Sequence, residues 1–335
     1  MKRFFLAALL LQATLASAQK SAYSVVPVTL PRELADKNNQ FSGLFRRDNQ
    51  LLLLSESRLQ ERAEAKVYAL DLPAIDAQMA KKPGELSYRK YPIERLDRIK
   101  ARIDSACQVY EGLEAMTLVG NEVYFTIETT TPSTYCYLIK GTLDEGRAAI
   151  VLDPAYLVPL PKPALTSNTH IHNAGFEAMV ADEKGLLLLF EFNSFGHDNQ
   201  GLRLPSGPLL PNDILRPVPL APLPFRVTDM VYEGKNRYTA INFFYKGDED
   251  AVYRPAAGDA NAKLVQDGSG YKNYCRLISL EYKKGQLSWK PTFELPAEYM
   301  PYNLEGLAAY RGGYFLINDK YGPSNQSTLL YLQKQ

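Results

Sequence analysis

The sequence predicts an all-β fold, a β-propeller of five blades closed by a strand from the N-terminus. Three observations support this prediction. A pair of polar residues fourteen positions apart recurs five times, two short apolar runs lie between the members of each pair, and more short apolar runs follow. Repetition of a small antiparallel unit is typical of propellers, in which four-stranded blades are arranged radially.

The polar pairs define the repeat. Seven of the ten positions are carboxylates, and the others are Ser, Thr and Asn. The pairs are Ser42 and Glu56, Glu114 and Glu128, Glu177 and Glu191, Thr228 and Asn242, and Glu305 and Asp319.

The apolar runs inside each pair predict hairpins. In the second repeat, residues 115–119 and 123–127 flank the turn Gly120-Asn121. Runs this short, rich in β-branched and aromatic residues and bounded by turn residues, indicate strands rather than helices. Outer strands are expected at residues 65–70, 86–91, 134–140, 149–152, 276–282 and 287–293.

The remaining segments fit around these hairpins. The third unit is the weakest, because the Pro-rich residues 205–224 disfavour strands. The fifth unit has only three strands, and residues 23–30 are expected to supply its fourth and close the ring. Helices are expected at residues 73–81 and 93–107. The alternative is a propeller of six blades, if residues 205–275 contain a degenerate one.

The N-terminus and the charge balance bound the function. Residues 1–18 have the basic start, apolar stretch and small-residue end of a signal peptide, so residues 19–335 are expected to be one exported domain, periplasmic or extracellular. No later apolar stretch is long enough for a membrane span. The net charge is +1 without a basic stripe, which argues against nucleic acid as a partner. A monomer that acts on a small molecule is expected.

Three cysteines leave two alternatives open. An exported chain with Cys107, Cys136 and Cys275 can form at most one internal disulfide. Cys107 and Cys136 are expected near the same rim, so a disulfide between them is one alternative. Three buried, reduced side chains are the other.

The polar pairs are expected to meet at one end of the channel. The first strand of a blade lines the channel and the second returns antiparallel, so both members of a pair lie at the same rim; Asp229 is adjacent. Seven carboxylates in one funnel require protons, basic partners or a bound cation. Oxygen ligands favour Ca²⁺, or Mg²⁺, over zinc. Alternatively, each Glu accepts backbone hydrogen bonds and holds the ring together.

Other groups could take part in chemistry at this rim. His170 and His172 precede the third repeat and His197 follows it, so one of them is a candidate general base. Arg58, Arg226 and Lys320 flank repeat positions and could neutralise the carboxylates.

The segments Gly175-Phe176-Glu177-Ala178 and Leu304-Glu305-Gly306-Leu307 give the chain a family resemblance. Over residues 41–332 it resembles the exported bacterial propeller family labelled "esterase-like activity of phytase". The resemblance implies hydrolysis of phosphate or carboxylic esters. The chain departs from the family pattern at Ala115 and Ala178, where Gly is usual, and at Asn242, where a basic residue is common. The matching acidic positions are Glu114, Glu128, Glu177, Glu191, Glu305 and Asp319.

These observations predict an exported hydrolase, an esterase or phosphodiesterase, with a cation-binding acidic funnel. Glu177 and His172 are the predicted catalytic residues. The alternative is a non-catalytic binding propeller with a structural metal or ring-closing carboxylates, and a calcium-dependent lactonase-like propeller is a third reading. The predicted metal ligands are Glu56, Glu114, Glu128, Glu177, Glu191, Glu305 and Asp319.

Overall fold

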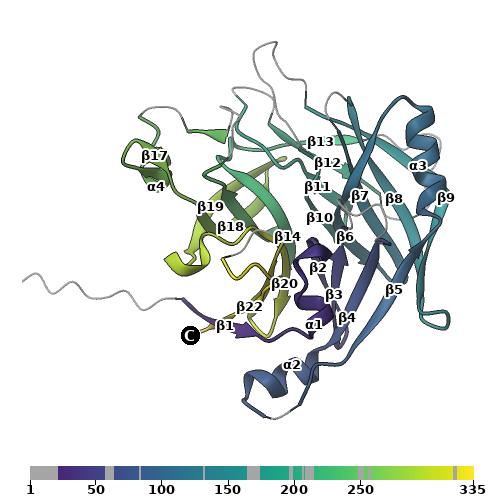
Figure 1. Cartoon of the computed structure of the whole chain (residues 1–335). Coiled ribbons are helices and arrows are strands. Elements are labelled where there is room, and N and C mark those ends of the chain that lie inside the picture. Colours follow the sequence, from purple (N-terminus) through teal and green to yellow (C-terminus); the bar gives the residue numbers. More distant parts are fainter. Residues whose placement is uncertain are drawn as a thin grey trace, which may run out of the picture.

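The computed structural model describes residues 22–335 with short gaps, and the fold is all-β, as predicted. Figure 1 shows the sheets arranged around a centre where β2, β6, β10, β14 and β20 lie. The gaps are residues 57–63, 83, 131–132, 164–173, 196–198, 206, 208–214, 248–252, 256–257 and 320–322.

The described strands, apart from one small hairpin, form five antiparallel sets of four, here called sheets 1 to 5. Sheet 1 comprises β2 (Phe41–Arg47), β3 (Gln50–Ser55), β4 (Lys66–Asp71) and β5 (Tyr88–Glu94). Sheet 2 comprises β6 (Tyr110–Val119), β7 (Glu122–Thr129), β8 (Tyr135–Asp144) and β9 (Ala149–Pro161). Sheets 1 and 2 join where β5 and β9 pair in parallel, which makes one eight-stranded sheet.

Sheets 3 to 5 repeat this order. Sheet 3 comprises β10 (Ala178–Asp182), β11 (Gly185–Leu189), β12 (Gln200–Leu204) and β13 (Arg216–Pro219). Sheet 4 comprises β14 (Arg226–Gly234), β15 (Arg237–Phe244), β18 (Tyr274–Lys283) and β19 (Gln286–Glu294). Sheet 5 comprises β20 (Leu304–Tyr310), β21 (Gly313–Asn318), β22 (Leu329–Lys334) and β1 (Tyr23–Val28). The Pro-rich segment thus contributes an outer-edge strand, β13, where proline is tolerated.

Short helices and one hairpin fill the connections. The predicted helices are found as α2 and α3, and α3 buries Leu96, Ile99 and Ile103 at helical spacing while its charged residues face outwards. The helical segments are α1 (Arg32–Ala35), η1 (Lys37–Asn39), α2 (Leu72–Met79), α3 (Leu96–Ser105), α4 (Ala262–Val265) and η3 (Ala297–Tyr299), and the hairpin is β16 (Gln266–Asp267) with β17 (Gly270–Tyr271).

The first strands of the sheets, β2, β6, β10, β14 and β20, are here called the inner strands. They contact one another in succession, and β20 contacts β2. Apolar cores lie between successive sheets. One of them combines Leu52 and Val67 of sheet 1 with Met116 and Phe125 of sheet 2. Burial between sheets therefore holds the arrangement together.

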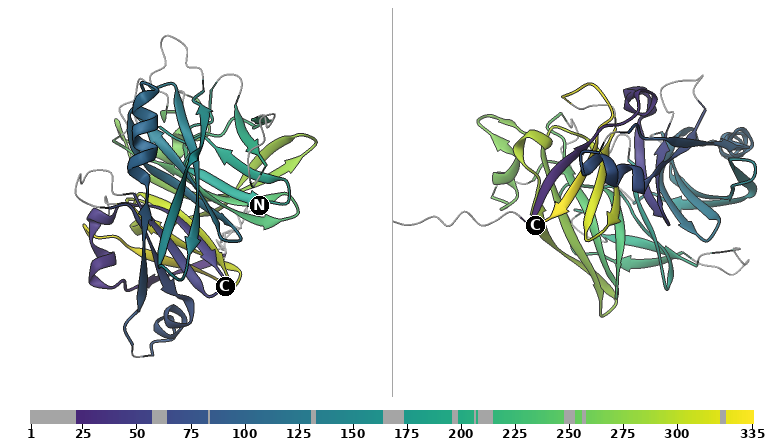
Figure 2. Two further views of the ribbon diagram at one scale, coloured as in Figure 1. Left: turned by 90° about the vertical axis from the view of Figure 1, so that its right-hand side faces the viewer. Right: turned by 90° about the horizontal axis from the view of Figure 1, so that it is seen from below.

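The N-terminal strand supplies the outer strand of the last sheet, as predicted. β1 pairs antiparallel with β22, from Tyr23 opposite Lys334 to Val28 opposite Leu329. Figure 2 shows β1, in purple, beside the yellow C-terminal strands. This pairing covers the edge of β22, which would otherwise be open to another chain.

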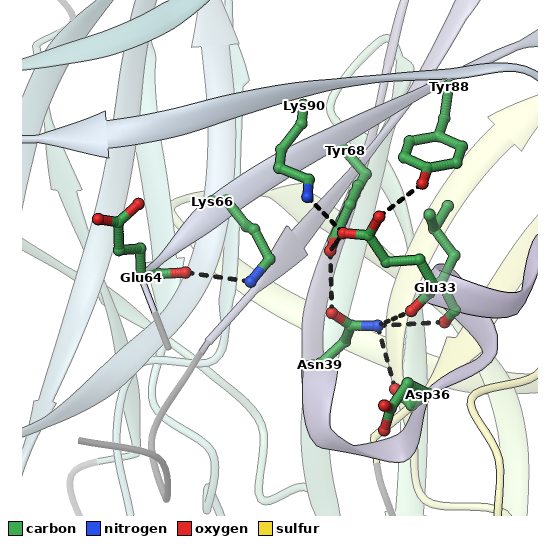
Figure 3. Close-up of polar contacts among 9 residues, drawn as sticks. Glu33, Asp36, Asn39, Glu64, Lys66, Tyr68, Tyr88 and Lys90 are labelled. Atoms are coloured by element: carbon green, nitrogen blue, oxygen red, sulfur yellow. Dashed lines mark hydrogen bonds and ion pairs between the residues drawn. The ribbon is translucent and has the colours of Figure 1, made fainter. Parts of the chain in front are cut away.

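A polar cluster fastens the segment between β1 and β2 to sheet 1 (Figure 3). The Glu33 carboxylate accepts hydrogen bonds from Tyr68 Oη (2.8 Å) and Tyr88 Oη (2.6 Å) and forms an ion pair with Lys90. The bonds from Lys90 and Tyr88 lower the pKa of Glu33 to about 2. Asn39 Nδ2 donates to the Glu33 carbonyl (2.7 Å). Hydrogen bonds therefore hold the backbone of Glu33 as well as its carboxylate.

All three cysteines are free thiols, so the alternative with a Cys107–Cys136 disulfide is wrong. Cys136 is buried in the core between sheets 2 and 3, whereas Cys107 lies exposed just after α3. Burial raises the pKa of Cys136 to about 12. Three buried thiols were the other expectation, and Cys107 departs from it.

In the described part of the chain, none of the helices is long and apolar enough to cross a membrane.

Candidate functional site

β-Bulges lie at the first member of four of the five polar pairs; in the third pair, Glu177 comes directly before β10. In β2, Phe41 opposes Ser55 and Gly43 opposes Leu54, so Ser42 is an extra residue. The same irregularity falls at Thr228, at Glu305 and, one residue wider, at Glu114. A bulge removes its extra residue from the alternation of a strand and re-aims the side chain. In these pairs, the side chain of the first polar residue therefore does not follow the alternating inward and outward directions of the side chains of its strand.

The second member of each pair lies where the second strand of its sheet ends. Glu56 follows β3 directly and Asp319 follows β21, and Glu128 is the penultimate residue of β7. Antiparallel pairing brings these ends beside the starts of the inner strands, as when Glu128 opposes Gly112. The pairs therefore lie at one end of the inner strands, as expected from their spacing.

In sheets 2, 3 and 4, the residue two positions before the first polar member of the pair contacts the preceding sheet. A Cβ atom on Gly112 would lie only 2.6 Å from Glu56 Oε1, and one on Gly175 would lie 3.3 Å from Glu128 Cβ. The equivalent residue of sheet 4 is Arg226, which forms an ion pair with Glu191. Glycine thus leaves space for a carboxylate between sheets, whereas arginine neutralises one.

Six of the carboxylates form what is here called the acidic cluster: Glu56, Glu114, Glu128, Glu177, Glu305 and Asp319. Burial raises the pKa of Glu114 well above its usual value, and repulsion from Glu56, Glu128, Glu177 and Glu305 raises it further. Burial, then repulsion from Asp319, Glu177 and Glu56, does the same to the pKa of Glu305.

Glu114 is the most informative member of the acidic cluster. Its side chain is buried, and among the described residues its Oε1 atom has no hydrogen-bond partner. A buried carboxylate in this position is costly unless it takes up a proton or a cation. The cluster therefore has the electrostatics of a site for a cationic species.

Three other polar residues of the inner strands fasten the sheets to one another. Ser42 Oγ donates to the Leu113 carbonyl (2.8 Å), and Thr228 Oγ1 donates to the Leu304 carbonyl (2.7 Å). Asp229 accepts hydrogen bonds from the backbone N–H of Leu307 (2.6 Å), Met230 (2.7 Å) and Leu44. The sequence placed these residues in the funnel, whereas the structure uses them to hold sheets 4, 5, 1 and 2 together.

In sheet 4, a positively charged arginine side chain lies where the other sheets have carboxylates. Buried Arg276 donates from Nε to Asn242 Oδ1 (2.8 Å), and Asn242 Nδ2 donates to the carbonyls of Pro224 (2.8 Å) and Arg226 (3.0 Å). Burial lowers the pKa of Arg276. The sequence did not predict this guanidinium, since it lies on β18, outside the fourteen-residue spacing.

Several predicted residues lie outside the described residues: His170, His172, His197, Arg58 and Lys320. Within the described ranges, no three His, Cys, Asp or Glu residues are arranged as a ready metal centre. The donor set still suits a hard cation, because it consists of carboxylates, Glu114 retains an unused oxygen, and the space beside Gly112 would be filled by a Cβ. Among the predicted ligands, Glu191 forms an ion pair with Arg226.

Substitution of Gly112 by alanine is expected to displace the Glu56 carboxylate without removing any charge. The clash at 2.6 Å involves the far end of a flexible side chain, so the fold should tolerate it with a loss of about 1 kcal/mol of stability. Affinity for a cation should fall about tenfold. Gly146→Ala, whose Cβ would approach only Asp144 Oδ1 at 3.4 Å, is the matched control. Unchanged cation affinity in Gly112→Ala would remove Glu56 from the site.

The raised pKa values predict that stability falls as the pH rises. A carboxyl whose pKa is higher in the folded chain holds its proton more tightly there, so stability is greatest below the unfolded value of about 4.3 and declines through the folded value. Glu114 and Glu305 both have raised pKa values. In cation-free buffer the melting temperature should therefore decrease between pH 5 and pH 8. A flat profile in this window would contradict the assignment.

Comparisons with known proteins give no family. No family model matches the chain, and no curated protein does. Solved structures do match, among them the major allergen Mala s 1 of Malassezia sympodialis (11% identity, 88% of this chain and 78% of that chain, TM-score 0.47). Others are the soluble aldose sugar dehydrogenase of Escherichia coli (12%, 93% and 100%, 0.45) and the catalytic domain of the Coprinopsis cinerea GH62 α-L-arabinofuranosidase (10%, 93% and 97%, 0.46). Likeness at this level assigns no function to this chain.

Proposed function

We propose that the protein is an exported, cation-dependent hydrolase that acts on a carboxylic ester or phosphodiester. The observation that carries the proposal is the buried acidic cluster, in which Glu114 and Glu305 repel several carboxylates and have raised pKa values. Ca²⁺, or Mg²⁺, is the cation proposed. When bound, such a cation polarises an ester and lowers the pKa of a water molecule.

The residues of the acidic cluster have different proposed roles in catalysis. Glu56, Glu128 and Asp319 are proposed to hold the cation. Glu177, from sheet 3, is proposed to accept the proton of the attacking water, and His172 is a second candidate for this role. Glu114 keeps a proton to higher pH than an ordinary carboxyl and is suited to donate it to the leaving group.

The architecture proposed for this enzyme is a five-bladed propeller, with sheets 1 to 5 as its blades. The succession of contacts among the inner strands and the pairing of β1 with β22 support it. Export is proposed from the signal-peptide pattern of residues 1–18. The resemblance to the esterase-like phytase family stays a prediction.

A non-catalytic binding protein is the second candidate. The observation that favours it is Asp229, a buried repeat-adjacent carboxylate that accepts backbone hydrogen bonds from two neighbouring sheets. In that reading the acidic cluster captures a cationic ligand, and the bound species stabilises the ring.

Hydrolysis assays decide between the two candidates. Hydrolysis of p-nitrophenyl butyrate and bis-p-nitrophenyl phosphate should be measured with Ca²⁺, with Mg²⁺ and with EDTA. The hydrolase reading expects cation-dependent turnover that Glu177→Gln lowers at least 100-fold while the melting temperature is kept. Glu183→Gln, at an exposed turn of sheet 3, is the matched control. Turnover that survives both EDTA and Glu177→Gln would contradict the proposed site.

A further inference from the structure

A cavity opens at the end of the channel opposite the acidic cluster. It has a volume of about 560 Å³ and is lined by residues from all five inner strands. The polar pairs mark the starts of these strands, and the cavity is lined by residues further along them, such as Phe45, Thr117, Ala181 and Ala309. This volume is within the range of small-molecule sites.

The floor of the cavity is apolar and separates it from the acidic cluster. On every inner strand, the residue two positions after the first polar member lines the cavity and is buried. Two residues of a strand span about 7 Å. The five floor residues are Leu44, Met116, Met179, Met230 and Leu307.

The mouth of the cavity carries an excess of positive charge. Arg46, Arg311 and Lys334 line it, against one acidic lining residue, Glu233. Arg311 pairs with Asp76 at 2.9 Å, but Arg46 and Lys334 form no ion pair with the described residues. The guanidinium of Arg46 and the ammonium group of Lys334 are therefore available to an anion.

Several polar groups of the wall are engaged within the protein. Glu233 accepts hydrogen bonds from Tyr314 Oη (2.8 Å) and Thr239 Oγ1 (3.2 Å), and Tyr310 Oη donates to Asp76 Oδ2 (2.8 Å). The wall thus combines aromatic and aliphatic side chains with these engaged polar groups, and the unpaired cations lie at its rim. An apolar body with one negative charge is complementary to both.

We propose that this cavity, here called the basic-end cavity, is a second binding site that takes a small organic anion with an aromatic or alicyclic body. Its sulfonate or carboxylate contacts Arg46 and Lys334, and its ring system fills the space above Met116, Met179 and Met230. The site is independent of the acidic cluster, because the apolar floor lies between them. It therefore adds a ligand of opposite charge to the one proposed for the other end.

Two matched fluorescent probes test this proposal. 1-Anilinonaphthalene-8-sulfonate is an anion, and N-phenyl-1-naphthylamine has the same ring system without the charge. The sulfonate should bind saturably with a stoichiometry of one. The double variant Arg46→Ala/Lys334→Ala should weaken the sulfonate about tenfold and leave the neutral probe unchanged, and Ala309→Trp should block both probes.

Two controls keep the outcomes distinct. Arg147→Ala removes an exposed arginine that pairs with Glu94 away from this cavity, and Glu114→Gln changes only the acidic cluster; both should bind the sulfonate like the parent protein. Melting curves exclude unfolding as the source of fluorescence. Equal sulfonate affinity in the parent protein, the double variant and Ala309→Trp would overturn the proposal, as would the absence of saturable binding.

Discussion

Substitution of Asp229 by alanine is expected to lower the free energy of unfolding by about 3–5 kcal/mol, a large part of the stability of an ordinary domain. The carboxylate accepts backbone hydrogen bonds from Leu307 and Met230, and from Leu44 of sheet 1. Alanine leaves these buried N–H groups without an acceptor. Urea unfolding followed by circular dichroism measures the loss.

A graded series tests whether the effect comes from the hydrogen bonds between sheets. Ser42→Ala removes one such bond, to the Leu113 carbonyl, and is expected to cost about 1 kcal/mol. Asp229→Asn keeps one carbonyl acceptor and should fall between Ser42→Ala and Asp229→Ala. If Asp229→Ala is as stable as Ser42→Ala, the carboxylate does not hold the sheets together.

Replacement of Glu114 by glutamine is expected to raise stability in cation-free buffer at pH 8, by about 1–2 kcal/mol. The substitution keeps the shape of the side chain and removes the charge that Glu56, Glu128, Glu177 and Glu305 repel. The same substitution should keep most of the stabilisation that a cation provides, because Glu56, Glu128 and Asp319 are the residues proposed to hold the cation. Melting temperatures in EDTA and in Ca²⁺ measure both effects.

A carboxylate in a different setting provides the control. Glu122 forms an ion pair with Lys140 at 2.8 Å, which lowers its pKa, so Glu122→Gln should be neutral or slightly destabilising at pH 8. A Glu114→Gln variant that is destabilised in EDTA would show that the charge of Glu114 is compensated, and the electrostatic account of the cluster would be wrong.

The fourteen-residue spacing predicted the hairpins and the end of the sheet at which each pair lies. It could not separate Ser42, Thr228 and Asp229 from the Glu positions, because the direction of a side chain at a bulge depends on contacts between sheets. The sequence has a glycine, Gly112 or Gly175, two positions before Glu114 and Glu177. The small size of these residues could have indicated that carboxylates pack closely against them. Arg276 gave no signal, since only strand pairing brings it to Asn242.

The cysteines show the same limit. Cys107 and Cys136 were expected near the same rim, which suggested a disulfide between them. A disulfide also requires the two side chains to face each other. Cys136 faces the core between sheets 2 and 3, and Cys107 faces solvent. The direction of a side chain, rather than its place along the chain, decided the outcome.

Thermal melting of the protein at pH 7.5, in EDTA and then with millimolar Ca²⁺ or Mg²⁺, tests the central claim most directly. We predict a rise of several degrees with one of these cations in the parent protein and little change in Glu128→Gln, which removes a residue proposed to hold the cation, because bound cation stabilises the folded state by mass action. The absence of a shift with either cation, or an equal shift in the variant, would contradict a cation site in the acidic cluster.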